Sequence, residues 1–150
     1  MHILQEVKRK IEFYCIYQDR CHEEVISKLR EMQMDRDEVD VIISQLITDN
    51  FLNEERFACS YARGKHRIKH WGKIRITNEL KFRKINQTLI KIALKEIKEE
   101  YDSNFEIWSQ KHWETITEKN VLKKRKKFCD YFLRRGFESF LVYDRVKELE

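Results

Sequence analysis

Six apolar positions recur three times along this chain of 150 residues, about 50 residues apart. A shift of 51 residues carries the first set onto the second, and a further shift of 52 carries the second onto the third. Repetition on this scale is typical of small supersecondary units stacked in a row, which bury their apolar faces against one another. The six columns are Val25/Ile76/Phe128, Leu29/Leu80/Phe132, Met34/Ile85/Phe137, Val39/Ile90/Val142, Ile43/Leu94/Val146 and Leu46/Ile97/Leu149.

The repeated unit is expected to be helical. The chain has no proline and only three glycines, whereas sheets of short strands need many turn-forming residues. Apolar residues recur instead at the three-to-four-residue spacing of helices. We therefore predict an all-α protein of three tandem three-helix, helix-turn-helix-like repeats that form an elongated curved array. The predicted repeats are residues 1–52, 53–102 and 103–150.

Local signals indicate where several of the nine expected helices begin and end. Asparagine, aspartate and serine cap helix N-termini because their side chains accept a hydrogen bond from the first turn. The second and third helices of each repeat are expected to meet in a tight turn near Gln33, Lys84 and Gly136. The predicted N-caps are Asp35, Asn53, Asn86, Ser103 and Asn120, and Gly72 is expected to interrupt the chain before the fifth helix.

Charge is distributed unevenly along the chain. Residues 1–50 have a balance of −4, residues 51–100 of +7 and residues 101–150 of +2. Between residues 63 and 84 there are nine basic side chains and only one acidic side chain, Glu79. A solvated helix normally mixes charges of both signs, because opposite charges one turn apart stabilise each other. This run therefore favours a polyanionic or acidic partner.

A second basic cluster spans residues 123–127 and continues at Arg134 and Arg135. If the repeats stack in order, we expect the two clusters to lie side by side as one basic strip that contacts DNA phosphates or acidic protein loops. Within the strip, Arg67 and Lys73 are expected to be exposed. The predicted strip comprises Arg63, Lys65, Arg67, Lys69, Lys73, Arg75, Lys81, Arg83, Lys84, Lys123, Lys124, Arg125, Lys126, Lys127, Arg134 and Arg135.

Aromatic rings interrupt the first basic run. Trp71 could stack on a nucleic-acid base, or it could fill the junction between the two flanking helices, and the packing role is favoured because large indoles are usually buried. His66 and His70 lie one helical turn apart, but no third metal ligand is near them in sequence. We expect these histidines to extend the basic surface and to become charged in acid.

Signals for catalysis, cofactors and membrane insertion are absent from the sequence. There is no G-x-S-x-G, P-loop or G-x-G-x-x-G motif, and we expect neither an enzyme nor a cofactor. No stretch approaches the ~20 apolar residues of a membrane span, and the first residues lack the apolar region of a signal peptide. A cytoplasmic protein is expected. The four cysteines form no C-x-x-C pair and are expected to be buried thiols: Cys15, Cys21, Cys59 and Cys129.

Three sequence segments resemble the RecX family: FLNEERFA at the start of the second repeat, the following YARGKHRIKHWGKIRITNEL, and RRGF near the end of the chain. The resemblance covers nearly the whole chain and is strongest from Phe51 to Leu80. RecX proteins are small bacterial regulators of the RecA recombinase. The resemblance implies a cytoplasmic, non-catalytic protein. It would bind the RecA–single-stranded-DNA filament in its groove and restrain ATP hydrolysis, strand exchange and the co-protease activity of the SOS response. The apolar columns and the lack of proline separately predict an elongated monomer.

One feature departs from the family. RecX proteins usually have glycine in the turn between the second and third helices, where a left-handed residue ends a helix. Here only Gly136 fits, and Gln33 and Lys84 hold the equivalent places, so those turns are either built differently or mildly strained. The alternative function is a free-standing nucleic-acid-binding helix-turn-helix protein, such as a transcription factor, which would select a duplex sequence.

Overall fold

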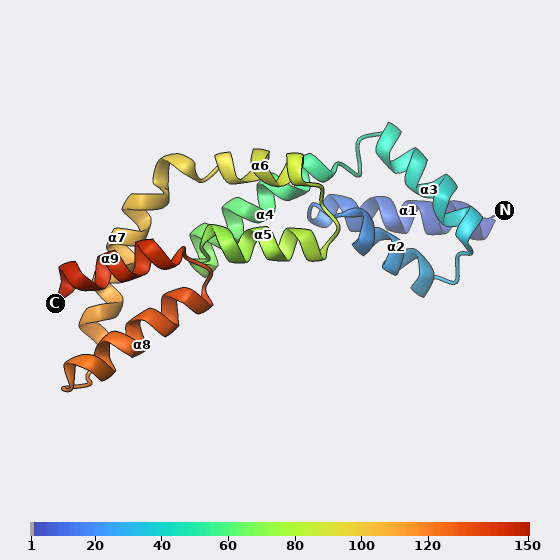
Figure 1. The fold of residues 1–150 in the computed structure, drawn as a ribbon. Helices are drawn as coiled ribbons and strands as arrows, with labels where there is room; N and C mark the ends of the chain where they lie inside the picture. The colour runs from blue at the N-terminus through green and yellow to red at the C-terminus, as the bar shows by residue number, and fades with distance from the viewer. Residues whose placement is uncertain (1) are drawn as a thin grey trace.

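The structure, a computed structural model, describes residues 2–150 and is all-helical over that range, with an elongated, bent shape (Figure 1). The two chain ends lie at opposite ends of the body. Within the described residues, no helix has an apolar stretch long enough to cross a bilayer. The helices are α1 (His2–Tyr17), α2 (His22–Glu31), α3 (Arg36–Thr48), α4 (Glu54–Lys69), α5 (Lys73–Phe82), α6 (Gln87–Lys95), α7 (Lys98–Thr115), α8 (Val121–Arg134) and α9 (Ser139–Leu149).

The helices fall into three units of three: unit one (α1–α3), unit two (α4–α6) and unit three (α7–α9). This arrangement confirms the predicted tandem three-helix fold. The repeated apolar columns form the cores, and Leu29, Leu80 and Phe132 are all buried at equivalent places. Whether the units are separate folding domains with the predicted boundaries remains a prediction.

Four of the predicted N-caps are confirmed. Asp35, Asn53, Asn86 and Asn120 each precede a helix, and each side chain accepts a hydrogen bond from the backbone amide three residues later. Such caps satisfy an amide that has no partner within the helix. These four helix starts were predictable because a cap and its amide are close in sequence.

The predicted cap at Ser103 is wrong, because α7 begins five residues earlier, at Lys98. The buried face of α7 includes Tyr101, one turn before Phe105, and both side chains are 2% exposed. Because Tyr101 already belongs to the buried face, the helix has to begin before this residue, closer to the N-terminus of the chain. The Ser103 hydroxyl instead donates to the Glu100 carbonyl at 3.1 Å, within the helix. The predicted boundary between residues 102 and 103 therefore falls inside α7.

The turn between the second and third helices has the same backbone form in all three units. Gln33, Lys84 and Gly136 have φ angles of 65°, 61° and 91°. The left-handed conformation therefore does not require glycine here, but a side chain in it costs about 1–2 kcal/mol. The turns of units one and two are built like that of unit three, with a small strain at Gln33 and Lys84.

Units two and three meet through their backbones, at a contact that we call the second junction. The Gly72 amide donates to the Arg135 carbonyl at 2.8 Å, and the Ile74 amide donates to the Gly136 carbonyl at 2.9 Å. A Cβ on Gly72 would lie 2.4 Å from the Gly136 carbonyl oxygen, so glycine is needed for this approach. One continuous apolar core runs through both units.

Units one and two meet mainly through polar side chains, at a contact that we call the first junction. The Asp19 carboxylate accepts from Arg56 Nε at 2.7 Å and from the Ser60 hydroxyl at 3.0 Å. The His22 amide donates to the Glu54 carboxylate at 3.1 Å. Unit one has its own apolar core, although Cys21, between α1 and α2, is buried in the core that units two and three share.

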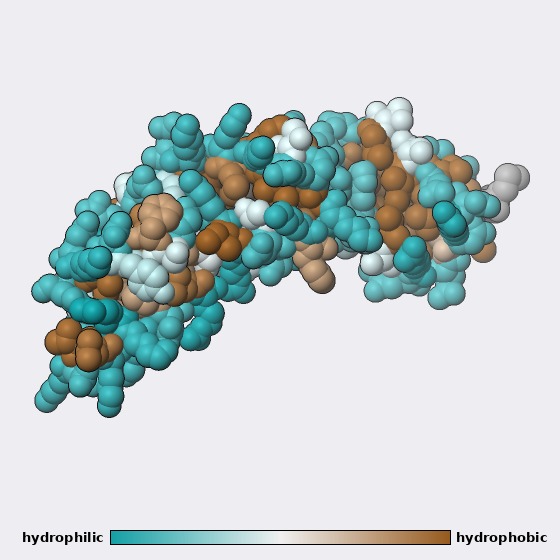
Figure 2. All heavy atoms as spheres, viewed as in Figure 1, coloured by the Kyte–Doolittle hydropathy of each residue, from teal (hydrophilic) through white to brown (hydrophobic). Residues whose placement is uncertain are grey.

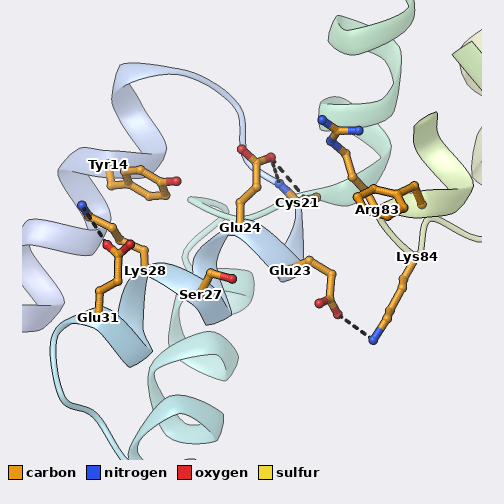
Figure 3. A pocket seen from close by; sticks show the side chains of 10 residues that line it. Tyr14, Cys21, Glu23, Glu24, Ser27, Lys28, Glu31, Arg83 and Lys84 are labelled. Atoms are coloured by element: carbon orange, nitrogen blue, oxygen red, sulfur yellow. Dashed lines mark hydrogen bonds and ion pairs between the residues drawn. The ribbon is translucent and has the colours of Figure 1, made fainter.

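A cleft of about 680 Å³ lies beside the first junction (Figure 3). Tyr14 and Glu31 line it from unit one, and Phe82 and Lys84 line it from unit two. The Lys84 ammonium reaches across to the Glu23 carboxylate at 3.5 Å. The first junction is therefore partly open to solvent, unlike the second.

Candidate functional site

Two arginines of the predicted strip are paired with glutamates from outside their own helix, Glu96 at the C-cap of α6 and Glu100 on α7. Arg63 on α4 donates to Glu96 at 2.8 Å. Arg67 donates to one Glu100 oxygen through Nε at 2.8 Å and through Nη2 at 2.6 Å. This hydrogen-bonded pair raises the pKa of Arg67 and lowers the pKa of Glu100, since both charged forms are favoured. Part of the positive charge of α4 is therefore neutralised.

Lys65, Lys73 and Arg75 of unit two lie over aromatic rings. Lys65 Nζ is 5.1 Å and the Arg75 guanidinium carbon 4.2 Å from the centroid of the Trp71 ring. Lys73 Nζ is 4.4 Å from the Tyr101 centroid, and the Lys73 amide donates to the Tyr101 hydroxyl at 3.0 Å. Lys73 is thus only partly exposed, and the expectation that its side chain is exposed is wrong.

Trp71 packs at the connection between α4 and α5, which agrees with the packing role that the sequence analysis favours. The ring is partly buried against the shared core and meets Tyr61 edge-on, with the centroids 6.3 Å apart. The Arg75 guanidinium covers part of the ring. Base stacking by Trp71 remains an untested prediction, but its surroundings are those of a packing residue.

The cations at the end of α5 face unit one. Arg83 pairs with Glu79 one turn earlier, at 3.0 Å. Lys84 pairs with Glu23 across the cleft of the first junction. Lys81 is exposed on the surface of α5. This part of the predicted strip lies at the opposite end of α5 from unit three, because α5 spans the length of unit two (Figure 1).

The unit-three cluster at residues 123–127 is not beside the basic run of unit two, so the single shared strip is wrong in this part. The cluster occupies the start of α8, and the end of α8 meets unit two (Figure 1). Fourteen helical residues separate the two ends by about 20 Å. Apolar Val121 and Leu122, 57% and 70% exposed, are the first two residues of α8. Figure 2 shows hydrophobic surface at this end of the molecule. Three cations of the cluster form ion pairs: Arg125 with Glu150, Lys126 with Asp130 and Lys127 with Glu118. Lys124 lies over the Trp113 ring. Lys123 has no ion pair within residues 2–150.

The two predicted clusters do meet at the second junction, in a group that we call the junction patch: Lys69, Arg75, Arg134 and Arg135. Arg135 Nη1 donates to the Lys69 carbonyl, and Arg75 Nη1 donates to the Arg134 carbonyl at 3.5 Å. The side chains of Lys69 and Arg134 are exposed, and neither has an ion-pair partner in the described part of the chain. The junction patch is therefore a concentrated positive surface available to an anionic partner.

His66 lies in the core, so the prediction that it extends the basic surface is wrong. Its side chain is 0% exposed. Its Nδ1 is 2.9 Å from the Trp71 carbonyl oxygen, and its Nε2 is 3.1 Å from the Asn104 amide nitrogen. These partners assign the proton to Nδ1 and leave Nε2 as an acceptor, which describes a neutral ring. Burial lowers the pKa of His66 because it penalises the charged form.

His70 is also not a free surface histidine. It adopts a left-handed conformation at the end of α4, with φ of 58°, and its ring stacks on Trp108 with the centroids 3.8 Å apart. Burial lowers the pKa of His70, and the nearby positive charge of Arg135 lowers it further. At neutral pH this ring acts as an aromatic group and contributes no charge.

The four cysteines are free and buried, which confirms the sequence prediction. Burial raises the pKa of Cys15 and of Cys21 to about 11, so both remain thiols at neutral pH. Within residues 2–150, no group of three or more histidine, cysteine or acidic side chains is arranged to hold a metal ion.

The chain is similar in sequence to proteins of the RecX family. Residues 53–94 match the family description "RecX, second three-helix domain". A regulatory protein RecX of Bacillus cytotoxicus is 25% identical over 138 residues, which cover 91% of this chain and 51% of the relative. A regulatory protein RecX of Bacillus mycoides is 22% identical over the same shares. The chain thus spans about half the length of the curated relatives it matches.

Solved structures show the same fold. A crystal structure of a regulatory protein RecX aligns with a TM-score of 0.84 at 20% identity, over 97% of this chain and 73% of that one. A crystal structure of RecX from Lactobacillus salivarius aligns with a TM-score of 0.78 at 22% identity, over 99% and 97%. The family match, the sequence relatives and the shared fold together confirm the resemblance: the chain is similar to proteins named regulatory protein RecX, and it has the fold of the RecX crystal structures.

Proposed function

We propose that this protein regulates the RecA recombinase by binding in the groove of the RecA–single-stranded-DNA filament, as a monomer in the cytoplasm. There it would restrain ATP hydrolysis, strand exchange and co-protease activity, and so act in DNA repair and the SOS response. It would do so without catalysis of its own. The proposal rests on the relation to proteins named as regulatory RecX.

The junction patch is the observation that supports this function most directly. Its cations lie on an elongated, bent body that can follow a groove (Figure 1). Lys69 and Arg134 are exposed and unpaired within the described residues, in contrast to Arg67, which Glu100 holds. A nucleoprotein filament presents phosphates and acidic side chains, and exposed cations attract both. We therefore assign the first contact with the filament to the junction patch.

The test is the ATPase rate of RecA filaments on single-stranded DNA, measured with and without stoichiometric amounts of this chain. The chain is expected to lower the rate. Lys69→Glu combined with Arg134→Glu should weaken this inhibition at least about tenfold, a loss of about 1.4 kcal/mol. Inhibition by the unchanged chain should weaken as salt rises, because salt screens the attraction.

The matched control reverses two exposed charges of unit one, Arg9→Glu with Arg36→Glu. This double variant has the same change in net charge and should inhibit like the unchanged chain. Equal inhibition by the junction-patch variant, folded by circular dichroism, would contradict the proposal. No effect on RecA, together with selective binding of one duplex sequence, would instead support the helix-turn-helix alternative.

A further inference from the structure

A pocket of about 220 Å³ opens where the end of α4 meets α7 and α8. His70 lines it from the C-cap of α4, Tyr131 from α8, and Trp108, Lys111 and His112 from α7. The α7 residues are three and four positions apart and therefore share one face of the helix. Pockets for drug-sized ligands are roughly 300–1,000 Å³, so this one suits a single planar heterocycle.

Two stacked pairs of rings form the walls of the pocket. His70 and Trp108 have centroids 3.8 Å apart and ring planes inclined by 11°. His112 and Tyr131 have centroids 3.7 Å apart and ring planes inclined by 16°. All four side chains are partly exposed. The ring nitrogens of His70 and His112 have no hydrogen-bond partner within residues 2–150, so they are available to a ligand.

Positive charge surrounds these rings. The Arg135 guanidinium carbon is 4.4 Å from the Tyr131 centroid, and the exposed Lys111 lies on the rim. None of the residues that line the pocket is acidic. Lys69 and Arg134 of the junction patch are the chain neighbours of His70 and Arg135. The pocket therefore combines exposed aromatic surface with cations at its edge, and both features suit a nucleotide.

We propose that this pocket is a base-stacking site for single-stranded nucleic acid. One base would pack against the aromatic rings, and the neighbouring phosphates would contact Lys69, Lys111 and Arg134. Stacking on aromatic side chains tolerates every base, and phosphate contacts carry no sequence information. A base paired and stacked in a duplex cannot enter, so the site selects single strands.

This inference rests on the proposed function and deepens it, since the pocket would bind the single-stranded DNA of the filament. It is tested without recombinase. The probes are a fluorescent oligodeoxythymidylate of about 15 nucleotides and an abasic strand of the same length, which has the same phosphates but no bases. Fluorescence anisotropy should show that the chain binds the thymidylate strand at least about fivefold more tightly, because only that strand can stack.

Trp108→Leu keeps an apolar side chain but removes the aromatic ring, and it should abolish the preference for thymidylate over the abasic strand. His70→Gly is a second variant that suits the left-handed backbone at this position and should also reduce the preference. Lys111→Glu should weaken binding of both strands at least about threefold. The matched control Lys91→Glu, an exposed lysine on α6, should leave both affinities unchanged.

Equal affinity of the unchanged chain for the two strands would overturn the base-stacking site. So would an unaltered preference in both Trp108→Leu and His70→Gly, with each variant folded by circular dichroism. Because the measurement contains no RecA, its outcome is separate from that of the ATPase test. Inhibition of RecA without preference for bases would leave the proposed function standing and remove only this site.

Discussion

The two junctions occupy equivalent places in the repeat but are built from different chemistry. At the second junction, Gly72 and Gly136 bring two backbones into hydrogen-bonding contact. The equivalent positions at the first junction, 51 and 52 residues earlier, are Cys21 and Lys84. Both have side chains, and the units are linked across this point by the ion pair between Lys84 and Glu23, beside an open cleft.

We infer from this difference that Gly72 and Gly136 allow units two and three to be joined more firmly than units one and two. Backbone contact at the second junction accompanies a continuous apolar core across units two and three. Ion pairs such as Asp19–Arg56 link the units at the first junction, where Cys21 is the buried unit-one residue that joins the shared core, and the other buried residues of unit one form their own core. Polar contacts that are partly exposed contribute less than apolar burial and are weakened by salt. We therefore expect the first junction to be the more mobile one.

The largest expected effect comes from adding a methyl group at the second junction. Gly136→Ala would place a Cβ 2.3 Å from the Arg75 Cβ, on a backbone with φ of +91°. Overpacking and backbone strain each cost about 1–3 kcal/mol, so the free energy of unfolding should fall by about 2–5 kcal/mol. Urea denaturation measures the loss.

The matched control for this substitution is Gly64→Ala within α4. A Cβ there meets nothing within 4 Å, and alanine is the better helix former, so a gain of about 0.5–1 kcal/mol is expected. A small loss in Gly136→Ala, similar in size to the effect at Gly64, would mean that the backbone contact of the second junction is dispensable.

A smaller effect is expected at the first junction. Asp19→Ala removes the carboxylate that accepts from Arg56 and Ser60, and should lower the free energy of unfolding by about 1 kcal/mol. Hydrogen exchange should accelerate in α1 and α2, with little change in α5 to α9. Asp40→Ala, on the exposed surface of α3, is the control and should alter neither. Acceleration spread evenly over the chain would show that the two junctions are equally firm.

The smallest expected effect is a loss of stability in acid, centred on the second junction. His66 is buried and neutral, and its folded-state pKa lies below the unfolded value of about 6.5. Below pH 6.5 the unfolded chain binds more protons at this site, so stability falls as pH decreases and stays constant above that range. The contribution of this one residue should be under about 1 kcal/mol at pH 6.

Urea midpoints at pH 7.5 and pH 6 measure this slope, with His66→Asn as the comparison. Asparagine has no titrating group at this position, so the variant should show a flatter dependence of stability on pH. His70 and His112 also have lowered pKa values because of burial, so part of the slope should remain. An identical slope in both proteins would mean that the His66 proton does not contribute.

Features set by nearby residues were predictable from the sequence. The caps at Asp35, Asn53, Asn86 and Asn120 contact amides three residues away, and the apolar columns report directly on burial. The start of α7 was missed because its first turn contains charged residues, and only Tyr101 shows that this turn is buried.

The candidate site was less predictable, because distant partners determine its charge. The sequence predicts that Arg67 is an unpaired cation, because its partner Glu100 lies 33 residues later and only the fold brings the two together. His66 lies among basic residues in sequence, yet it is buried against Asn104 from α7. The one available signal for the aromatic pocket was the one-turn spacing of Trp108 and His112, which is also common in ordinary packed helices.

The glycine contact at the second junction also has a mechanical consequence. Because units two and three share one apolar core and are joined by backbone hydrogen bonds, we expect them to move together as one rigid body (Figure 1). Unit one would then rotate relative to units two and three about the first junction. If the junction patch holds units two and three against a curved surface, the range over which unit one can rotate about the first junction would set which curvatures the molecule can match.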